Sequence, residues 1–225
     1  MMVDLVLDQE ATLFVDQYDT PHIRYNHHDV MKTYPLKTSS IKHWMSKLLW
    51  DSIEKAPGGE AINSALNVLK AMAREGPRLS LYNRVAPGEL ESIWIDMADP
   101  YWQAIHVKTN GWEITTPPIL FRRFSHQQPL PTPVPGGDVR ETLEFANLPH
   151  PDHQLLFVVD TITKFIPEIP HPISYFYGSH GSGKTTAMIA QRAVVDPSIV
   201  KLLKLPKNDR ELIQQLHHHY LSYYD

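Results

Sequence analysis

Residues 178–185, GSHGSGKT, match the pattern G-x-x-x-x-G-K-[ST] through Gly178, Gly183, Lys184 and Thr185. Glycines allow the backbone to fold closely around a phosphate, so that successive N–H groups point at the anion. The helix that we expect to begin near Lys184 adds the positive end of its dipole at the same place. The stretch therefore predicts a phosphate-binding loop.

Each part of this loop has an expected role toward a nucleoside triphosphate. Lys184 should reach the β- and γ-phosphates, and the Thr185 hydroxyl should be a ligand of Mg²⁺. ATP and Mg²⁺ are the predicted cofactors, and the sequence leaves the choice between ATP and GTP open. The residues predicted to surround the nucleotide are Gly178, Ser179, His180, Gly181, Ser182, Gly183, Lys184, Thr185 and Thr186.

The segments around the loop predict a βαβ unit. The short apolar run ISYFY (173–177) precedes the loop and is typical of a buried strand. The helix after the loop should end at Asp196-Pro197, and a short helix is expected over 209–217. The run YLSYY (220–224) then predicts a second strand that ends in Asp225.

Asp225 has the place of the acid that holds Mg²⁺ at the end of a neighbouring strand, and we predict it as a catalytic residue and metal ligand together with Thr185. The alternative is an ordinary carboxylate. The histidines predict no further metal site. His150 and His153 have usable spacing but no third ligand, and His217, His218 and His219 are consecutive and cannot all face one ion.

A proline-rich stretch separates two regions of different pattern. Six prolines fall between Pro117 and Pro135, and the stretch ends in PTPVPGG (131–137), which is typical of an extended connector. We therefore predict an α/β fold in which an α+β accessory domain precedes the front part of a P-loop NTPase domain with a parallel sheet. The expected bounds are 1–125 for the accessory domain, 126–138 for the connector and 139–225 for the partial P-loop NTPase domain.

The accessory region combines helical and strand patterns. A hairpin is expected from 11–16 and 21–26, and helices are expected from Ser39 to Ile53 and from Glu60 to Gly76. Four β-like runs follow, with turns at Pro87-Gly88 and Asn110-Gly111, and predict an antiparallel sheet. The runs cover 79–86, 92–97, 103–108 and 113–116. After the connector, 155–166 predicts a helix that ends before Pro167.

Composition excludes several classes of site. The chain has 225 residues, a net charge of −4 and no cysteine, so disulfides, thiolate zinc sites, iron–sulfur clusters and cysteine nucleophiles are excluded. Asp4 and Asp8 stand where a signal peptide carries basic residues. No apolar run approaches the ~18 residues of a membrane helix. We expect a cytoplasmic protein with no membrane partner.

Two local patches raise the question of single-stranded DNA as a partner. Phe121-Arg122-Arg123-Phe124 mixes guanidinium and aromatic groups, which is the chemistry that holds single strands. Lys201, Lys204 and Lys207 recur every three residues and form a second basic group. The alternative is that these side chains are solvated or ion-paired within the protein.

The segment GSHGSGKTTAMIAQRAVVDPS (178–198) resembles the P-loop region of ATP-binding proteins from prophages and integrated elements. These are AAA+ or superfamily-3-like ATPases related to primase-helicases, and the resemblance extends to 81–123 and 205–215. It implies ATP binding within a DNA-replication helicase-like ATPase, which works in its full-length form as a homo-oligomeric ring. The chain stops where that family continues beyond Asp225, so we expect little ATP hydrolysis from it. The alternatives are a non-enzymatic DNA- or protein-interaction module with a vestigial P-loop, and a small-molecule kinase-like protein.

Overall fold

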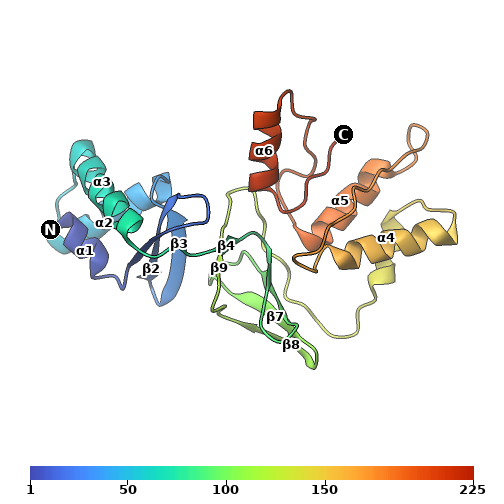
Figure 1. The fold of residues 1–225 in the computed structure, drawn as a ribbon, viewed down its shortest axis with the longest axis horizontal. Helices are drawn as coiled ribbons and strands as arrows, with labels where there is room; N and C mark the ends of the chain where they lie inside the picture. Colours follow the sequence, from blue (N-terminus) through green and yellow to red (C-terminus); the bar gives the residue numbers. More distant parts are fainter. The chain divides into compact units, whose positions relative to one another are not determined.

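Three sheets and six α-helices make up a mixed α/β structure in the computed structural model, which describes all 225 residues (Figure 1). The chain divides into two units. Unit 1 comprises Met1–Tyr82 and Pro118–Arg122, and unit 2 comprises Asn83–Pro117 and Arg123–Asp225. The predicted mixed α/β class is confirmed. None of the helices has both the length and the apolar character that crossing a membrane requires.

Unit 1 is built on an antiparallel three-stranded sheet with three helices and a small parallel pair. The strand order is β1-β2-β3, and β4 pairs with β9. The strands are β1 (Thr12–Val15), β2 (Pro21–His27), β3 (Val30–Pro35), β4 (Leu81–Tyr82) and β9 (Leu120–Phe121). The helices are α1 (Met2–Leu7), α2 (Ser39–Ile53) and α3 (Gly59–Glu75). The predicted hairpin and both predicted helices are confirmed, whereas α1 and β3 were not expected from the sequence.

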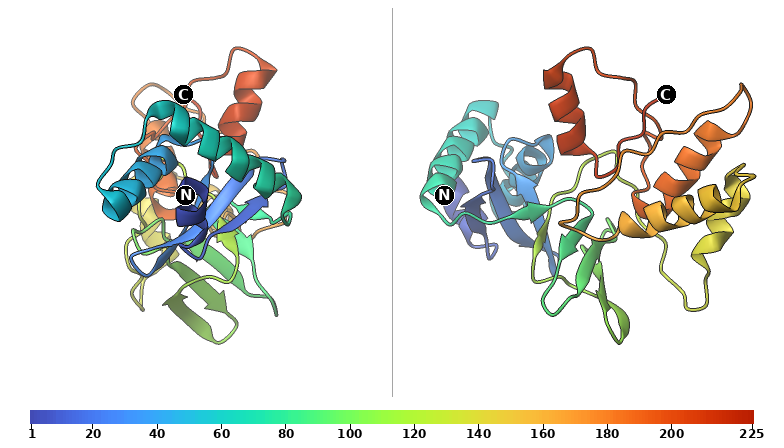
Figure 2. Two further views of the ribbon diagram at one scale, coloured as in Figure 1. Left: turned by 90° about the vertical axis from the view of Figure 1, so that its left-hand side faces the viewer. Right: turned by 45° about the vertical axis from the view of Figure 1, so that its right-hand side comes forward.

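The core of unit 1 lies between the sheet and its helices (Figure 2). Ile23 and Tyr25 are two residues apart on β2 and so share one face, and both belong to a single buried cluster with side chains of α1, α2 and α3. Gly76 ends α3 where a Cβ would lie 2.5 Å from the carbonyl oxygen of Leu13 in β1. At this helix stop the backbone therefore lies against β1 with no room for a side chain.

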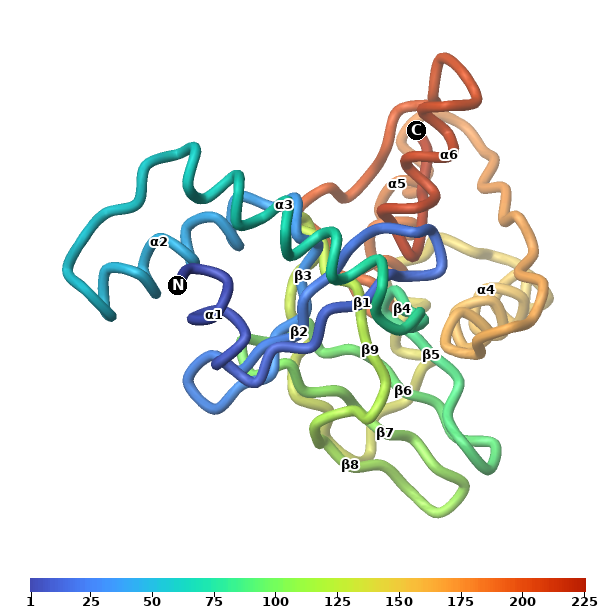
Figure 3. The backbone as a smooth tube through the Cα atoms, turned by 60° about the vertical axis from the view of Figure 1, so that its left-hand side comes forward, coloured from blue at the N-terminus to red at the C-terminus, as the bar shows by residue number.

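Unit 2 begins with the predicted antiparallel sheet, a four-stranded meander in the order β5-β6-β7-β8 (Figure 3). The strands are β5 (Val85–Pro87), β6 (Ile93–Asp96), β7 (Ala104–Lys108) and β8 (Gly111–Thr115). Ile95, Met97 and Ile105 form its buried cluster, and Leu130 and Phe165 pack against them.

This packing divides the chain differently from the predicted domain bounds. The apolar face of the sheet is covered by Leu130 of the proline-rich stretch and by Phe165 from beyond it. Residues 83–117 therefore group with the C-terminal region and not with the N-terminal helices. The alternation of apolar residues in the strands indicates that one face of the sheet is buried, but not which distant segment of the chain covers it. The sequence therefore could not indicate which neighbour would bury it.

The remainder of unit 2 is helical. It contains the 3₁₀ helix η1 (Val139–Phe145) and the α-helices α4 (Pro151–Thr163), α5 (Lys184–Val195) and α6 (Asp209–His218). The three α-helices confirm the helical predictions. α4 begins four residues earlier than expected because Pro151 occupies its first turn, where the missing proline N–H is not needed.

The predicted parallel sheet around α5 is not formed. Residues 173–177 run as extended chain without a paired strand, and the Ile173 side chain is 99% exposed. The run 220–224 contributes only an isolated parallel bridge between Tyr224 and Leu203. A buried parallel strand needs a paired strand beside it and covering layers on its faces. The second run lies along α5 instead, so the first has no strand to pair with.

Candidate functional site

The loop at 178–183 turns by means of its glycines. Gly178, Gly181 and Gly183 have φ values of 149°, 76° and 85°, which L-residues with side chains rarely adopt. A Cβ on Gly178 would also lie 2.8 Å from the hydroxyl oxygen of Ser182. Gly183 is the N-cap of α5 and offers no side chain to the first N–H groups of the helix. Those groups remain available to an anion.

Lys184 folds back over this loop. Its ammonium group donates to the carbonyl oxygens of Gly178 at 3.1 Å and Ser179 at 2.9 Å, and to the Ser182 hydroxyl at 3.3 Å. Ser179, His180 and Gly181 are exposed at the tip of the loop. A positive charge therefore lies against the loop beside the N-terminal end of α5, and its partners there are neutral groups.

Thr185 and Asp225 meet at the same end of α5, although 40 residues separate them in the chain. The Thr185 hydroxyl donates to a carboxylate oxygen of Asp225 at 3.3 Å, and both side chains are exposed. A hydroxyl and a carboxylate are oxygen ligands of the kind that Mg²⁺ prefers. The donor set thus fits the predicted cofactor. Thr186, the last residue predicted for the site, is exposed one position further along the helix.

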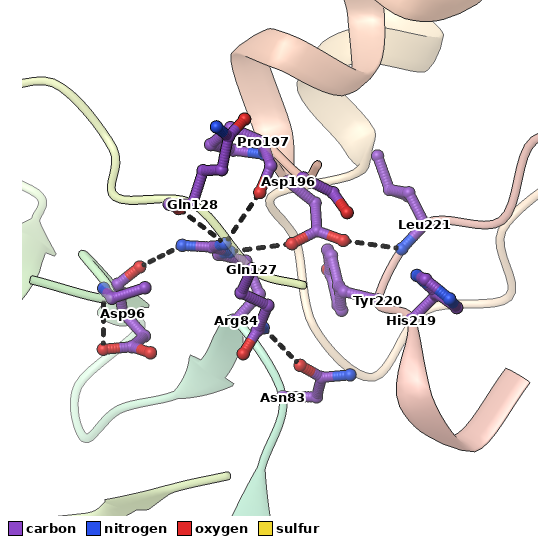
Figure 4. A network of polar contacts seen from close by, with 12 residues as sticks. Asn83, Arg84, Asp96, Gln127, Gln128, Asp196, Pro197, His219, Tyr220 and Leu221 are labelled. Carbon is purple, nitrogen blue, oxygen red and sulfur yellow. Dashed lines mark hydrogen bonds and ion pairs between the residues drawn. The ribbon is translucent and has the colours of Figure 1, made fainter. Parts of the chain in front are cut away.

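The other end of α5 is held by a buried ion pair that sequence reasoning missed (Figure 4). Arg84 and Asp196 are both fully buried, and Arg84 Nε donates to Asp196 Oδ1 at 2.9 Å. The other guanidinium nitrogens donate to the carbonyl oxygens of Asp96 at 2.9 Å, Gln128 at 3.2 Å and Pro197 at 3.4 Å. The pair joins the C-cap of α5 to the antiparallel sheet. The sequence indicated Asp196 only as a helix stop.

A histidine pair lies next to this network. Arg192, buried in α5, donates to Nδ1 of His219 at 2.9 Å, and the His219 ring stacks on His126 at 4.0 Å between ring centroids. Burial, followed by the nearby His126 and Arg192, lowers the pKa of His219 to about 4. Burial also lowers the pKa of His126. His219 is therefore neutral near pH 7 and free to accept the hydrogen bond from Arg192.

The segment 121–124 does not present the single-strand-binding surface that its composition suggested. In unit 1, Phe121 is buried and Arg122 forms an ion pair with buried Asp16. In unit 2, Arg123 binds Asp96 and lies over the Trp102 ring at 4.2 Å. The ion-paired alternative is the one that the structure favours here. The three lysines of the second patch, Lys201, Lys204 and Lys207, are exposed.

Comparisons with protein-family models, curated proteins and solved structures give no match for this chain. The resemblance to mobile-element ATPases stays a prediction, and the functional argument rests on the geometry of the site.

Proposed function

We propose that unit 2 binds a nucleoside triphosphate with Mg²⁺ at the N-terminal end of α5. The observation that carries the proposal is the gathering of Lys184, Thr185 and Asp225 at one end of one helix, beside a loop turned by three glycines. The sequence pattern requires the first two residues to be adjacent, but it does not require Asp225 to lie within 3.3 Å of Thr185.

Each group would have a distinct task. The ammonium group of Lys184 would exchange its loop carbonyl partners for β- and γ-phosphate oxygens, which are charged and therefore stronger acceptors. The free N–H groups at the start of α5 would bind the same phosphates. Thr185 and Asp225 would hold Mg²⁺, which neutralises the charge on the phosphates when it is bound.

The wider role implied by the resemblance, a replication ATPase that acts on DNA as a ring, remains part of the proposal with less support in the geometry. Arg122 and Arg123 are committed to Asp16 and Asp96 within their own units. Any contact with a single strand would therefore fall to other groups, of which the exposed lysines at 201, 204 and 207 are the candidates.

Equilibrium binding of a fluorescent, non-hydrolysable ATP analogue tests the nucleotide site. Lys184→Ala should weaken binding about 10- to 100-fold, because a hydrogen bond to a charged group contributes about 1.5–3 kcal/mol. Lys201→Ala, which removes an exposed lysine elsewhere in unit 2, is the matched control and should leave the affinity unchanged. Competition with unlabelled ATP and GTP would identify the preferred base.

The proposal fails if the wild-type protein does not bind the analogue, or if Lys184→Ala binds it as tightly as the wild type does. Helical content of the variant, measured by circular dichroism, separates loss of the site from loss of the fold.

A further inference from the structure

The hydrogen bond between Thr185 and Asp225 is too weak to hold Asp225 in place by itself. It is 3.3 Å long and exposed to water, which competes for both groups. Asp225 has one backbone contact, from its N–H to the carbonyl oxygen of Leu203 at 3.2 Å. The position of the carboxylate must therefore be fixed by the residues that precede it.

The segment 219–225 runs back along α5 from its C-terminal end to its N-terminal end. His219 accepts from Arg192. The Leu221 N–H donates to Asp196 at 3.3 Å (Figure 4). Further along, the Tyr223 hydroxyl donates to the amide oxygen of Gln191 at 2.5 Å. Two residues later the chain reaches Thr185, so the Tyr223 contact is the last side-chain anchor before Asp225.

This last anchor is buried and has a fixed direction. Gln191 is fully buried, and its amide nitrogen donates to Asp160 and to the Thr161 hydroxyl of α4, both at 2.8 Å. The amide oxygen is thereby turned toward Tyr223. Burial raises the pKa of Tyr223, so its hydroxyl keeps the proton that it donates.

We propose that the Gln191–Tyr223 hydrogen bond is a positioning device that places the Asp225 carboxylate beside the Thr185 hydroxyl and so sets the Mg²⁺ dependence of nucleotide binding. The inference rests on the proposed function, because it concerns the same site. Tyr223 and Gln191 touch neither nucleotide nor metal in this scheme. They act only through the location of Asp225.

The neighbouring tyrosine supplies a matched control. The Tyr224 hydroxyl is buried but has no hydrogen-bond partner, so Tyr224→Phe removes the same atom one residue closer to Asp225 without breaking a hydrogen bond. Tyr223→Phe removes the hydroxyl that Gln191 binds and keeps the ring. If Tyr223→Phe only disrupted the structure, the affinity for the ATP analogue would fall both with Mg²⁺ and with EDTA. If it displaces Asp225, only the affinity measured with Mg²⁺ falls.

The experiment measures the affinity of the fluorescent ATP analogue with Mg²⁺ and with EDTA, for the full chain. Tyr223→Phe should keep its affinity in EDTA within about twofold of wild type, and the gain from Mg²⁺ should fall about fivefold, the equivalent of one hydrogen bond of about 1 kcal/mol. Tyr224→Phe should match the wild type in both conditions. Asp225→Asn should lose most of the Mg²⁺ gain.

Hydrogen exchange of the 219–225 amides without nucleotide gives a second, ligand-free measurement, and it should be faster in Tyr223→Phe than in Tyr224→Phe. The inference is overturned if Mg²⁺ raises the affinity of Tyr223→Phe as much as that of the wild type, or if it does not raise the affinity of the wild type. The proposal of nucleotide binding stands in both cases. If the wild type binds the ATP analogue neither in EDTA nor in Mg²⁺, the proposed function is overturned. If hydrogen exchange of the 219–225 amides is the same in Tyr223→Phe as in Tyr224→Phe, Tyr223 does not hold the segment.

Discussion

The Arg84–Asp196 pair is the polar contact of unit 2 whose loss should cost most. Arg84→Met keeps a side chain of similar reach but removes the guanidinium donors that bind Asp196 and three carbonyl oxygens. Removing one partner of a buried ion pair costs about 3–5 kcal/mol, because the other charge stays buried without compensation. The Leu221 N–H at 3.3 Å and Arg192 at 4.0 Å still face Asp196, so we expect a loss near 3 kcal/mol.

Hydrogen exchange followed by mass spectrometry at increasing urea is the assay, because it reports the two units separately in one full-length chain. Peptides from β6, β7 and α5 should lose protection at lower urea in Arg84→Met. Peptides from α2 and α3 in unit 1 serve as the internal reference. Arg140→Met, which breaks an exposed pair with Asp138, is the control and should cause no measurable change.

A double-mutant cycle makes the reasoning refutable. Asp196→Asn removes the charge but keeps an acceptor for Leu221, so the double variant should lose much less stability than the sum of the two single variants, with a coupling of about 2 kcal/mol. Additive losses, or a loss below about 1 kcal/mol for Arg84→Met, would show that this pair does not hold α5 to the sheet.

Three further predictions follow from single contacts. Gly178→Ala should weaken nucleotide binding about fivefold or more, from strain of about 1–3 kcal/mol at its positive φ, whereas Gly137→Ala, in open space, should not change the affinity. Arg123→Met should destabilise unit 2 by about 3 kcal/mol, because it leaves the buried Asp96 carboxylate without its partner. It should leave the salt dependence of single-stranded DNA binding unchanged, and a plot of log affinity against log salt whose slope falls by one phosphate contact would contradict this. Because the pKa of His219 is lower in the folded protein, the unfolded chain binds the proton at a higher pH than the folded chain does. The free energy of unfolding, measured by urea titration, should therefore fall as the pH drops from about 6.5 to about 4. His219→Asn, which keeps an acceptor, should flatten that fall, and an unchanged pH profile would argue against it.

Elements whose pattern is local could be predicted from the sequence. α2 buries Ile41, Met45 and Leu49, four residues apart, and that spacing is visible without knowing what covers it. The turn at Asn110-Gly111 is equally local, because Gly111 has a φ of 143°. The same holds for the glycine loop before Lys184, whose requirement for positive φ is carried by its own residues.

Contacts between distant residues could not be predicted in this way. Arg84 and Asp196 are 112 positions apart, and neither stands in a pattern that marks it as buried. Residues 173–177 show the opposite error, because an apolar aromatic run indicates a buried strand only if another strand pairs with it. Tyr175 and Tyr177 instead stack on each other in exposed chain, with ring centroids 6.4 Å apart.

The sequence indicated neither the buried Arg84–Asp196 pair nor the absence of a parallel sheet around α5. Together these two findings explain how the site is supported. α5 has twelve residues and is therefore about 18 Å long, with the glycine loop at one end and Asp196 at the other. With no parallel sheet beneath it, the helix is fixed by Arg84 at its C-cap and by Asp160 and Thr161 of α4 at Gln191. The same buried face of α5 also anchors the segment that ends in Asp225. A change at Asp196 or Gln191 should therefore reach the phosphate end of the helix through the position of Asp225, whereas a change at exposed Ala193 or Val194 should not.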